Sequence, residues 1–493
     1  MDFSGRIYYM VGIKGTGMAS LAVLLKRAGG DVSGCDTAEV FSTDSMLQRY
    51  AIEIDSGFSP SLLKLPLDFV IYSSAYAINI PILSKAKELG LSVYSYPQFL
   101  AFLSQQSDSY AVSGTHGKTT TTSVASYLLS SGSLSEFPLY SIYGSFLQGA
   151  EALMFQGSDC ALFEACEYQD HFLSYSLRGA LVTNIEHDHP DYFSSRAAVQ
   201  KSFERFVDNL QPNGFLICCS DDPGARKLAQ YCRERRTDVT LLTYGFDDNG
   251  PFRIIKNGYF DTYTLACLDG KNFKVNVHDR SLVGDHIGAV VLALAIILDR
   301  PQPKLYLDEH TLITEEVVPT LAGMLVDKLV SFPGCVGRSE LMLEQDSVIY
   351  IDDYAHHPTE ISATLQELRA RYPSCIITLL FAPHTSSRTK AFLKDFVSAL
   401  SQADRVIIQA SFASARNDVS EGEDMGKVLE TELSKHIMRT FRCRCQACSY
   451  APDDQSAVAI AASWLQPNSL CITMGAGNNR ALSACIAQAR RSL

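Results

Sequence analysis

One loop constrains the fold of this 493-residue chain more than any other stretch. Residues 113–120 read Ser-Gly-Thr-His-Gly-Lys-Thr-Thr, between the apolar residues 110–112 and a helical pattern over 121–129. A glycine-bracketed Lys-Thr loop between a strand and a helix points its backbone N–H groups at a phosphate. We therefore predict a nucleotide-binding α/β unit, with Lys118 on the β- and γ-phosphates and Thr119 on Mg²⁺.

The loop departs from the general pattern at its start, because Val112 stands six residues before the lysine, where a glycine is usual. A glycine turn that opens an ordinary helix is the alternative interpretation. The strand-loop-helix context favours a phosphate loop. The residues expected to contact ATP here are Gly114, Thr115, Gly117, Lys118, Thr119 and Thr120.

The length of the chain predicts three domains, because one hydrophobic core serves roughly 150 residues. We place their limits at 1–106, 107–327 and 328–493. A hydrophobic fraction of 46% and a charged fraction of 19% describe an ordinary globular chain. The net charge of -12 argues against nucleic acid and anionic membranes as general partners. Small molecules are therefore the expected partners.

Two further features concern the cellular environment. The longest apolar run, residues 288–298, falls well short of the roughly 20 residues that cross a bilayer, and no secretory signal is evident. We expect a cytoplasmic protein without membrane insertion, as a monomer or weak homodimer.

The 14 cysteines are scattered, which is typical of free thiols. Cys443, Cys445 and Cys448 could hold a metal with a fourth ligand, but surface or half-buried thiols explain them better.

The N-terminal unit contains a second loop suited to phosphate. A β-rich run over 6–12 leads into a loop in which Gly15 and Gly17 fit G-x-G-x-x-G, with Ser20 in place of the last glycine. A nucleoside diphosphate fits this pattern, and a plain tight turn is the alternative. The next strand ends at Asp36, about where a carboxylate meets a ribose hydroxyl. The expected contacts are Gly12, Gly15, Thr16, Gly17 and Asp36, with Ser73 and Ser74 after the strand 68–72.

Strands that follow the phosphate loop end in carboxylates and imidazoles. One apolar strand ends at Glu164, and Mg²⁺ prefers such oxygen ligands beside bound phosphates. The strand 179–183 leads into a polar cluster in which His189 or Asp188 could ligate a second cation or orient a reacting carboxylate. His187 is as well explained as a bystander.

The rest of the central unit changes character. Residues 214–282 read as short β pieces separated by Asp and Gly turns, which indicates a partly antiparallel periphery without chemistry. An apolar helix is expected from Ala289, with Gly284, Asp285 and His286 leading into it. Its composition suits a core better than a cofactor site.

The C-terminal unit reads as a Rossmann-like domain. A strand leads into Asp352 and His357, with Pro358 in the first turn of the next helix. A second strand leads to Arg388, whose planar guanidinium suits a phosphate or carboxylate. A later strand precedes a tight loop over 475–478.

The order and spacing of these motifs resemble the Mur ligase family over nearly the whole chain. The matching runs are Gly12 to Met18, Gly114 to Thr120, Glu164 to Glu167, Thr183 to His189, Asp352 to Glu360, Pro383 to Lys390 and Gly475 to Gly477. The resemblance implies a three-domain α/β fold. Its parts would be a Rossmann-like UDP-binding domain, a central P-loop ATPase domain with a mixed sheet, and a Rossmann-like domain that closes on ATP and binds an amino acid.

The resemblance also implies a reaction with ATP and Mg²⁺ as cofactors. ATP would phosphorylate the carboxylate of UDP-N-acetylmuramate, and L-alanine would attack the acyl phosphate to form an amide. Glycine and L-serine stay open as acceptors, because so small a difference is worth only ~1–3 kcal/mol in a pocket. The implied site residues are the catalytic and metal-binding Lys118, Thr119, Glu164 and His189, the ATP contacts His286, Arg338 and Asp352, and the amino-acid contacts His357 and Arg388.

Several positions depart from the family pattern. Lys14 stands in the first loop where glycine is usual, which is tolerable if the lysine faces the diphosphate. Ile287 and Val290 replace asparagines that help to hold adenine. Thr385 and Gly337 stand where arginines are common, so two cations near the amino acid and ATP are missing.

Three alternatives follow. A recycling ligase of the same family would attach a whole tripeptide instead of L-alanine. A nicotinamide oxidoreductase would use Gly15 and Gly17 but would leave Lys118 and His189 without a role. A ligase-derived protein that binds a UDP-sugar without catalysis would explain the missing asparagines and arginines.

Overall fold

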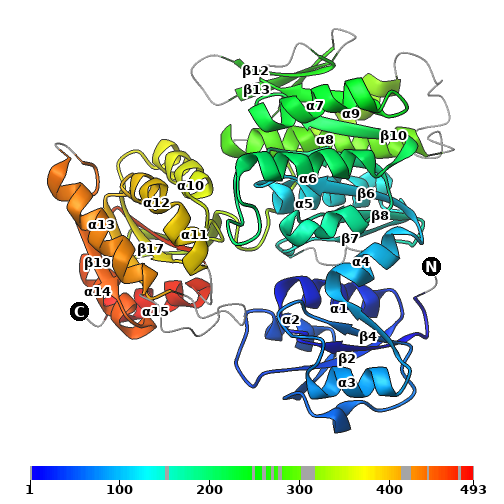
Figure 1. The fold of residues 1–493 in the computed structure, drawn as a ribbon. Coiled ribbons are helices and arrows are strands. Elements are labelled where there is room, and N and C mark those ends of the chain that lie inside the picture. The colour runs from blue at the N-terminus through cyan, green and yellow to red at the C-terminus, as the bar shows by residue number, and fades with distance from the viewer. Residues whose placement is uncertain are drawn as a thin grey trace. The chain divides into compact units, whose positions relative to one another are not determined.

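The computed structural model describes residues 3–149, 155–246, 250–257, 262–267, 271–275, 280–300, 317–411, 424–440, 443–475 and 479–491. Its strands form three sheets with helices around them, which confirms the predicted α/β class (Figure 1). The chain divides into two compact units, Met1–Asp188 with Tyr192–Pro333, and His189–Asp191 with Gly334–Leu493. The first unit contains two of the sheets.

The N-terminal sheet is parallel throughout and has the order β3-β2-β1-β4-β5. Its strands are β1 (Ile7–Val11), β2 (Asp31–Asp36), β3 (Glu53–Ser56), β4 (Phe69–Tyr72) and β5 (Ser92–Ser95), and its helices are α1 (Thr16–Arg27), α2 (Asp44–Arg49), α3 (Pro81–Glu88) and α4 (Tyr96–Ser104). Strand order reverses between β1 and β4. Ligands of such sheets bind at the carboxyl ends of the strands beside that switch point.

The central sheet has nine strands in the order β14-β13-β12-β11-β10-β9-β6-β8-β7. Pairing is parallel from β7 to β12 and antiparallel between β12, β13 and β14, which confirms the mixed sheet and its antiparallel periphery. The strands are β6 (Asp108–Ser113), β7 (Leu139–Ile142), β8 (Cys160–Glu164), β9 (Leu177–Val182), β10 (Leu210–Cys219), β11 (Thr240–Gly245), β12 (Phe252–Asn257), β13 (Thr262–Cys267) and β14 (Asn272–Val275).

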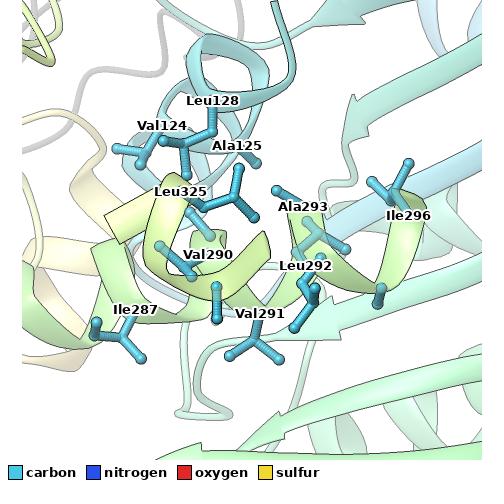
Figure 2. Close-up of a cluster of buried hydrophobic side chains, with 14 of the residues drawn as sticks. Val124, Ala125, Leu128, Ile287, Val290, Val291, Leu292, Ala293, Ile296 and Leu325 are labelled. Atoms are coloured by element: carbon cyan, nitrogen blue, oxygen red, sulfur yellow. The ribbon is translucent and has the colours of Figure 1, made fainter. Parts of the chain in front are cut away.

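The largest apolar core lies between this sheet and helices α5 (Lys118–Ser130), α8 (Arg280–Asp299) and α9 (Val317–Leu329). Figure 2 shows Val124 and Leu128 of α5 facing Val290 of α8 and Leu325 of α9. Helices α6 (Arg196–Asp208) and α7 (Pro223–Arg235) complete the domain. Among the described helices, α8 alone is long and apolar enough to cross a bilayer, but 72% of that window is buried, as in the core helix of a globular domain.

The start of α8 corrects the sequence prediction. We expected the helix from Ala289, but it begins at Arg280, so Gly284 and His286 lie inside it. A glycine inside a helix costs only about 1 kcal/mol relative to alanine, and burial of the apolar face outweighs this cost.

The first two sheets are joined by packed contacts within the first unit. Phe3 is 2% exposed, and its ring meets the Tyr140 ring edge-on with centroids 5.6 Å apart. The Tyr140 hydroxyl lies 2.8 Å from that of Ser107, and the backbone N–H of Ser176 donates to Ser104 Oγ at 3.0 Å. The two glycine loops therefore belong to one packed body.

The third sheet has the order β15-β16-β20-β17-β18-β19 and is parallel apart from the β15–β16 pair. Its strands are β15 (Glu340–Gln345), β16 (Val348–Asp353), β17 (Ile376–Ala382), β18 (Arg405–Gln409), β19 (Ala447–Ala451) and β20 (Ser469–Gly475). Its helices are α10 (Pro358–Arg371), α11 (Ser386–Ala391), α12 (Leu393–Leu400), α13 (Met425–Arg439), α14 (Asp454–Trp464) and α15 (Asn479–Arg491). This confirms a Rossmann-like C-terminal domain.

Two details of this unit bear on the sequence predictions. The edge strand β15 went unpredicted, because it carries two glutamates and the exposed Leu341. In the expected tight loop after β20, residues 476–478 lie outside the described residues. Helix α9 continues past 327 to Leu329, and the exact domain limits stay predictions.

Candidate active site

The predicted phosphate loop lies between β6 and α5 and needs both of its glycines. Gly114 has φ +135°, and a Cβ there would come within 2.1 Å of Thr183 Oγ1. Gly117 has φ +78° and precedes the first residue of α5, where a Cβ would come within 2.5 Å of Asp285 Oδ1. A side chain at either position would be strained in backbone conformation and would clash.

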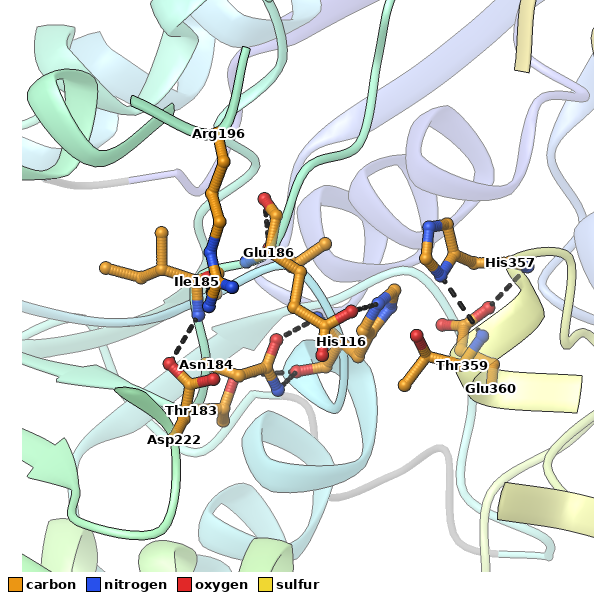
Figure 3. Close-up of polar contacts among 12 residues, drawn as sticks. His116, Thr183, Asn184, Ile185, Glu186, Arg196, Asp222, His357, Thr359 and Glu360 are labelled. Atoms are coloured by element: carbon orange, nitrogen blue, oxygen red, sulfur yellow. Dashed lines mark hydrogen bonds and ion pairs between the residues drawn. The ribbon is translucent and has the colours of Figure 1, made fainter. Parts of the chain in front are cut away.

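Residues that follow β9 hold the loop from the side (Figure 3). The His116 N–H donates to Asn184 Oδ1 at 2.8 Å, and Thr183 Oγ1 donates to the His116 carbonyl at 2.6 Å. The Glu186 N–H donates to Thr115 Oγ1 at 2.9 Å, and the Glu186 carboxylate lies 3.5 Å from His116 Nε2. Sequence reasoning missed this clamp of hydrogen bonds. The signal that could have revealed it is that β6 and β9 are parallel neighbours, so the residues that follow them lie at the same edge of the sheet.

Lys118 begins α5 and turns back over the loop. Its Nζ donates to the carbonyls of Gly114 at 2.5 Å and Thr115 at 2.9 Å, and to Glu167 Oε2 at 3.0 Å. Burial alone would lower the pKa of Lys118, but the carboxylates around it, chiefly that of Glu167, raise it above its usual value. The lysine is therefore charged near neutral pH. Glu167, which is 2% exposed, had no predicted role.

Thr119 and Glu164 lie together, as expected of metal ligands. Thr119 Oγ1 donates to both carboxylate oxygens of Glu164, at 2.9 and 3.0 Å, and the Gly144 N–H donates to Oε2 at 2.7 Å. A hydroxyl and a carboxylate beside a phosphate loop form the hard oxygen set that Mg²⁺ takes together with substrate phosphates. Thr120 is buried in the same helical turn.

The histidines after β9 differ from one another. His187 Nε2 lies 3.0 Å from the Phe193 carbonyl, which suits the bystander interpretation. His189 has a left-handed backbone with φ +53°, unusual for a residue with a side chain and found mainly at turns and functional sites. It belongs to the short segment that groups with the second unit, and its role as a metal ligand stays a prediction.

The N-terminal glycine loop is enclosed by aromatic side chains. Gly12 has φ +79°, and a Cβ there would come within 2.5 Å of the Tyr76 ring. A Cβ on Gly17 would come within 3.0 Å of the Tyr96 ring. Gly15 directly precedes Thr16, the first residue of α1, so the first N–H groups of that helix lie at the loop.

Asp36 has a local structural role. Its Oδ2 accepts the Lys14 N–H at 2.8 Å, while its Oδ1 accepts from Thr37 N at 2.8 Å and from the Tyr76 hydroxyl at 3.1 Å. The carboxylate is 3% exposed. It therefore fixes the loop, and a ribose contact stays a prediction.

The serines after β4 differ in exposure. Ser73 Oγ accepts the Ala75 N–H at 3.3 Å, which forms a turn, and Ser74 is exposed. Their contact with a diphosphate stays a prediction.

The Lys14 side chain turns toward the backbone of a neighbouring loop. A lysine there is tolerable if it faces the diphosphate, but Nζ instead donates to the carbonyls of Thr37 at 3.1 Å and Glu39 at 2.7 Å. The ammonium is attracted into the loop after β2, where these acceptors surround it.

The expected adenine region of α8 is packed against other side chains. His286 is 5% exposed, its Nδ1 lies 2.6 Å from the Leu282 carbonyl, and its ring meets Phe332 edge-on at 5.6 Å. Ile287 and Val290 are at most 1% exposed and belong to the core (Figure 2). The two apolar replacements therefore serve packing.

In the second unit, His357 caps helix α10. Its Nδ1 accepts the Thr359 N–H at 3.3 Å, and Glu360 Oε2 accepts the backbone N–H groups of His356 and His357 at 3.1 and 3.2 Å (Figure 3). This reciprocal capping box fixes the start of the helix. An amino-acid contact by the histidine stays a prediction.

Arg388 lies nearby in the chain, on α11. It is 4% exposed, and its Nη1 lies 3.3 Å from His384 Nδ1. Thr385, at a position where arginine is common, is the N-cap of α11, since its Oγ1 accepts the Arg388 N–H at 3.4 Å. The threonine thus orders the turn that carries Arg388.

The carboxyl end of β16 holds two buried aspartates. Asp352 Oδ1 accepts from Thr473 Oγ1 at 2.7 Å, and burial raises the pKa of Asp352 to about 6. Burial also raises the pKa of Asp353, although Arg338 and two backbone N–H groups act to lower it. The Arg338 guanidinium lies over the Tyr354 ring at 5.5 Å. Gly337 has φ +68°, a conformation that an arginine would adopt only with strain.

The chain combines a Rossmann-like sheet, a P-loop domain and a second α/β unit, and family models match all three parts. The Mur ligase family, catalytic domain model matches residues 7–108, the Mur ligase middle domain 112–297, and the Mur ligase, glutamate ligase domain 337–477. The chain belongs to the Mur ligase family, whose members are ATP-dependent ligases.

Similar proteins carry a more particular name. UDP-N-acetylmuramate–L-alanine ligase of Treponema pallidum subsp. pallidum is 33% identical over 484 residues, covering 97% of this chain and 95% of the relative. The crystal structure of UDP-N-acetylmuramate-alanine ligase MurC from Thermotoga maritima superposes with a TM-score of 0.73 at 20% identity, covering 99% of each chain. A murein peptide ligase from Psychrobacter arcticus gives 0.69 at 17% identity, also covering 99% of each. At these identities the structures support the fold alone.

Proposed function

We propose that this chain joins L-alanine to the carboxylate of UDP-N-acetylmuramate at the expense of ATP, in the synthesis of peptidoglycan precursors. The observation that carries the proposal is the arrangement of charged Lys118 over the glycine loop with Thr119 and Glu164 beside it. The identity of 33% to a protein named for this reaction, over nearly the whole chain, favours L-alanine over a tripeptide.

The proposed reaction has two steps. A carboxylate oxygen of UDP-N-acetylmuramate attacks the γ-phosphorus of ATP, and ADP leaves. The amine of L-alanine then attacks the acyl carbon, inorganic phosphate leaves, and the nitrogen loses a proton. The first step brings two anions together, so Lys118 and the N–H groups around Gly117 would offset their repulsion and stabilise the transferring phosphoryl group. Mg²⁺, held by Thr119 and Glu164, would supply further positive charge.

Other residues have proposed roles by family resemblance. His189 would ligate a metal near the acyl phosphate, and His357 and Arg388 would position the amino acid. The UDP moiety would bind the loop Gly12–Gly17 at the carboxyl ends of β1 and β4, the ligand position of doubly wound sheets. His286, Arg338 and Asp352 would contact ATP.

The reaction itself is tested with purified protein, ATP, Mg²⁺ and UDP-N-acetylmuramate. L-Alanine, glycine, L-serine and the tripeptide are supplied separately, and phosphate release and product mass are measured. We expect L-alanine to give the highest kcat/KM. Turnover with the tripeptide alone would instead identify a recycling ligase, and a lack of turnover with every acceptor would contradict the proposal.

Replacing Lys118 by alanine tests the chemistry of the site. Ligation should fall below detection, while binding of UDP-N-acetylmuramate should stay within about threefold, because its proposed loop lies on another sheet. Removal of the lysine leaves the buried Glu167 carboxylate without its cation, so Lys118→Ala with Glu167→Gln is the folding control. The double variant should recover the melting temperature without recovering ligation. Normal turnover in either variant would contradict the assigned role.

A further inference from the structure

Lys14 of the N-terminal glycine loop makes polar contacts through both its backbone and its side chain. Its backbone N–H donates to Asp36 at 2.8 Å, and its carbonyl accepts from Thr43 Oγ1 at 2.6 Å. Its Nζ donates to the carbonyls of Thr37 and Glu39 and lies 3.5 Å from a carboxylate oxygen of Asp44. All of these partners lie within residues 36–44.

The side chain fastens a segment that has little burial of its own. Residues 37–43, between β2 and α2, include exposed side chains, with Val40 at 80% exposure. Lys14 lies beneath this segment, where it is 8% exposed and its ammonium is 5.6 Å from the centre of the Phe41 ring. Thr43, the N-cap position of α2, uses its hydroxyl on the Lys14 carbonyl and makes no side-chain cap. The segment is therefore tied to the glycine loop at both of its ends.

Residues 37–43 lie at the end of the sheet where a nucleotide would bind. In doubly wound sheets the diphosphate lies at the loop after the first strand, and the ribose extends toward the carboxyl end of the neighbouring strand, here β2. Residues 37–43 follow β2 directly and so would flank the ribose and the base of a nucleotide bound at the Gly12–Gly17 loop. A glycine at position 14 would provide none of these side-chain contacts.

We propose that Lys14 is a positioning residue for the uridine part of the substrate, acting by holding residues 37–43 in their binding conformation. This inference rests on the proposed function, because it takes the nucleotide to be a UDP-sugar. An ordered loop binds more tightly than a loose one, since less conformational entropy is lost on binding. Lys14 would therefore affect capture of the UDP-substrate and leave phosphoryl transfer alone.

Lys14→Met tests this, because methionine keeps an apolar stem and removes the ammonium. The KM for UDP-N-acetylmuramate should rise about tenfold, the change expected from losing one hydrogen bond to a charged group. We expect kcat and the KM values for ATP and L-alanine to stay within about twofold. Amide hydrogen exchange over residues 37–43 should become faster, and Lys14→Arg should recover part of both effects.

The matched control is Lys26→Met, which removes a half-buried lysine of α1 whose Nζ lies 3.7 Å from Asp31. It should change neither KM nor exchange. An unchanged KM for UDP-N-acetylmuramate in Lys14→Met would overturn the inference, as would an equal loss in every kinetic parameter. If the unsubstituted enzyme does not turn over UDP-N-acetylmuramate, the proposed function fails separately. Unchanged exchange over 37–43 in Lys14→Met would then overturn the loop restraint itself.

Discussion

Two buried charged residues, Lys118 and Asp352, differ in how their charge is compensated. Lys118 stays charged because Glu167 compensates for its burial, and the same carboxylate holds its ammonium over the loop carbonyls. Asp352 accepts a hydrogen bond from the Thr473 hydroxyl, and burial raises its pKa to about 6 although the charge of Arg480 opposes this rise. Lys118 therefore stays charged around neutral pH, whereas the pKa of Asp352 lies close to neutrality.

The pKa of Asp352 predicts a pH-dependent stability. Because its pKa rises from 3.8 to about 6 on folding, the native state holds the proton more tightly, and stability falls as pH rises through this window. Asp352→Asn does not titrate and keeps an acceptor for Thr473. Its free energy of unfolding relative to wild type should increase by about 2 kcal/mol between about pH 4 and pH 7. Urea denaturation at several pH values measures this difference, and a flat difference would refute it.

At the scale of elements, α8 links the core to the nucleotide loop. Asp285 lies against Gly117, while Ile287 and Val290 on the same helix pack into the core with α5 and α9. The family asparagines at these two positions would be buried here among aliphatic side chains. Helix α8 therefore contributes packing at the positions where the family resemblance implied adenine recognition.

Restoring the family residue by Ile287→Asn should accordingly destabilise the protein. Burying an amide in an aliphatic site and losing the packed side chain should cost about 2–4 kcal/mol. The KM for ATP should not improve. Leu298→Asn, on the same helix but 38% exposed, is the control and should cost less than about 1 kcal/mol. Thermal denaturation compares the stabilities of the two variants. A lower KM for ATP in Ile287→Asn would show that adenine does reach this position.

At the scale of the whole molecule, the chain consists of two units of different content. The first contains both glycine loops, and aromatic contacts such as Phe3 on Tyr140 join its two sheets. The second contains the proposed amino-acid contacts His357 and Arg388. The proposed contacts with the UDP-substrate thus lie in the first unit, and those with the amino acid lie in the second.

This division predicts the behaviour of a truncated chain. Residues 1–333 should fold alone and bind UDP-N-acetylmuramate within about threefold of the full chain, because a compact unit keeps its own core. Ligation should be absent, since the proposed acceptor contacts are missing. Calorimetric titration and the phosphate assay test both statements. A soluble fragment that ligates L-alanine would contradict the assignment of His357 and Arg388.

The sequence by itself determined the α/β class and the position of the phosphate loop. Gly114, Gly117 and Lys118 are recognisable because a strand, a tight turn and a helix leave a local pattern within a dozen residues. Glu164 was predictable for the same reason, as the last residue of an apolar strand in the same sheet. Such local patterns also identified the family.

Only the tertiary structure decided which distant groups meet. The Glu167 partner of Lys118, the Asn184 clamp on His116 and the start of α8 at Arg280 depend on strand order and core packing, which no local pattern encodes. Lys14 is the clearest case. Its sequence position left open whether it faces the diphosphate, and the carbonyls of Thr37 and Glu39, brought alongside by the β1–β2 pairing, attract its ammonium instead.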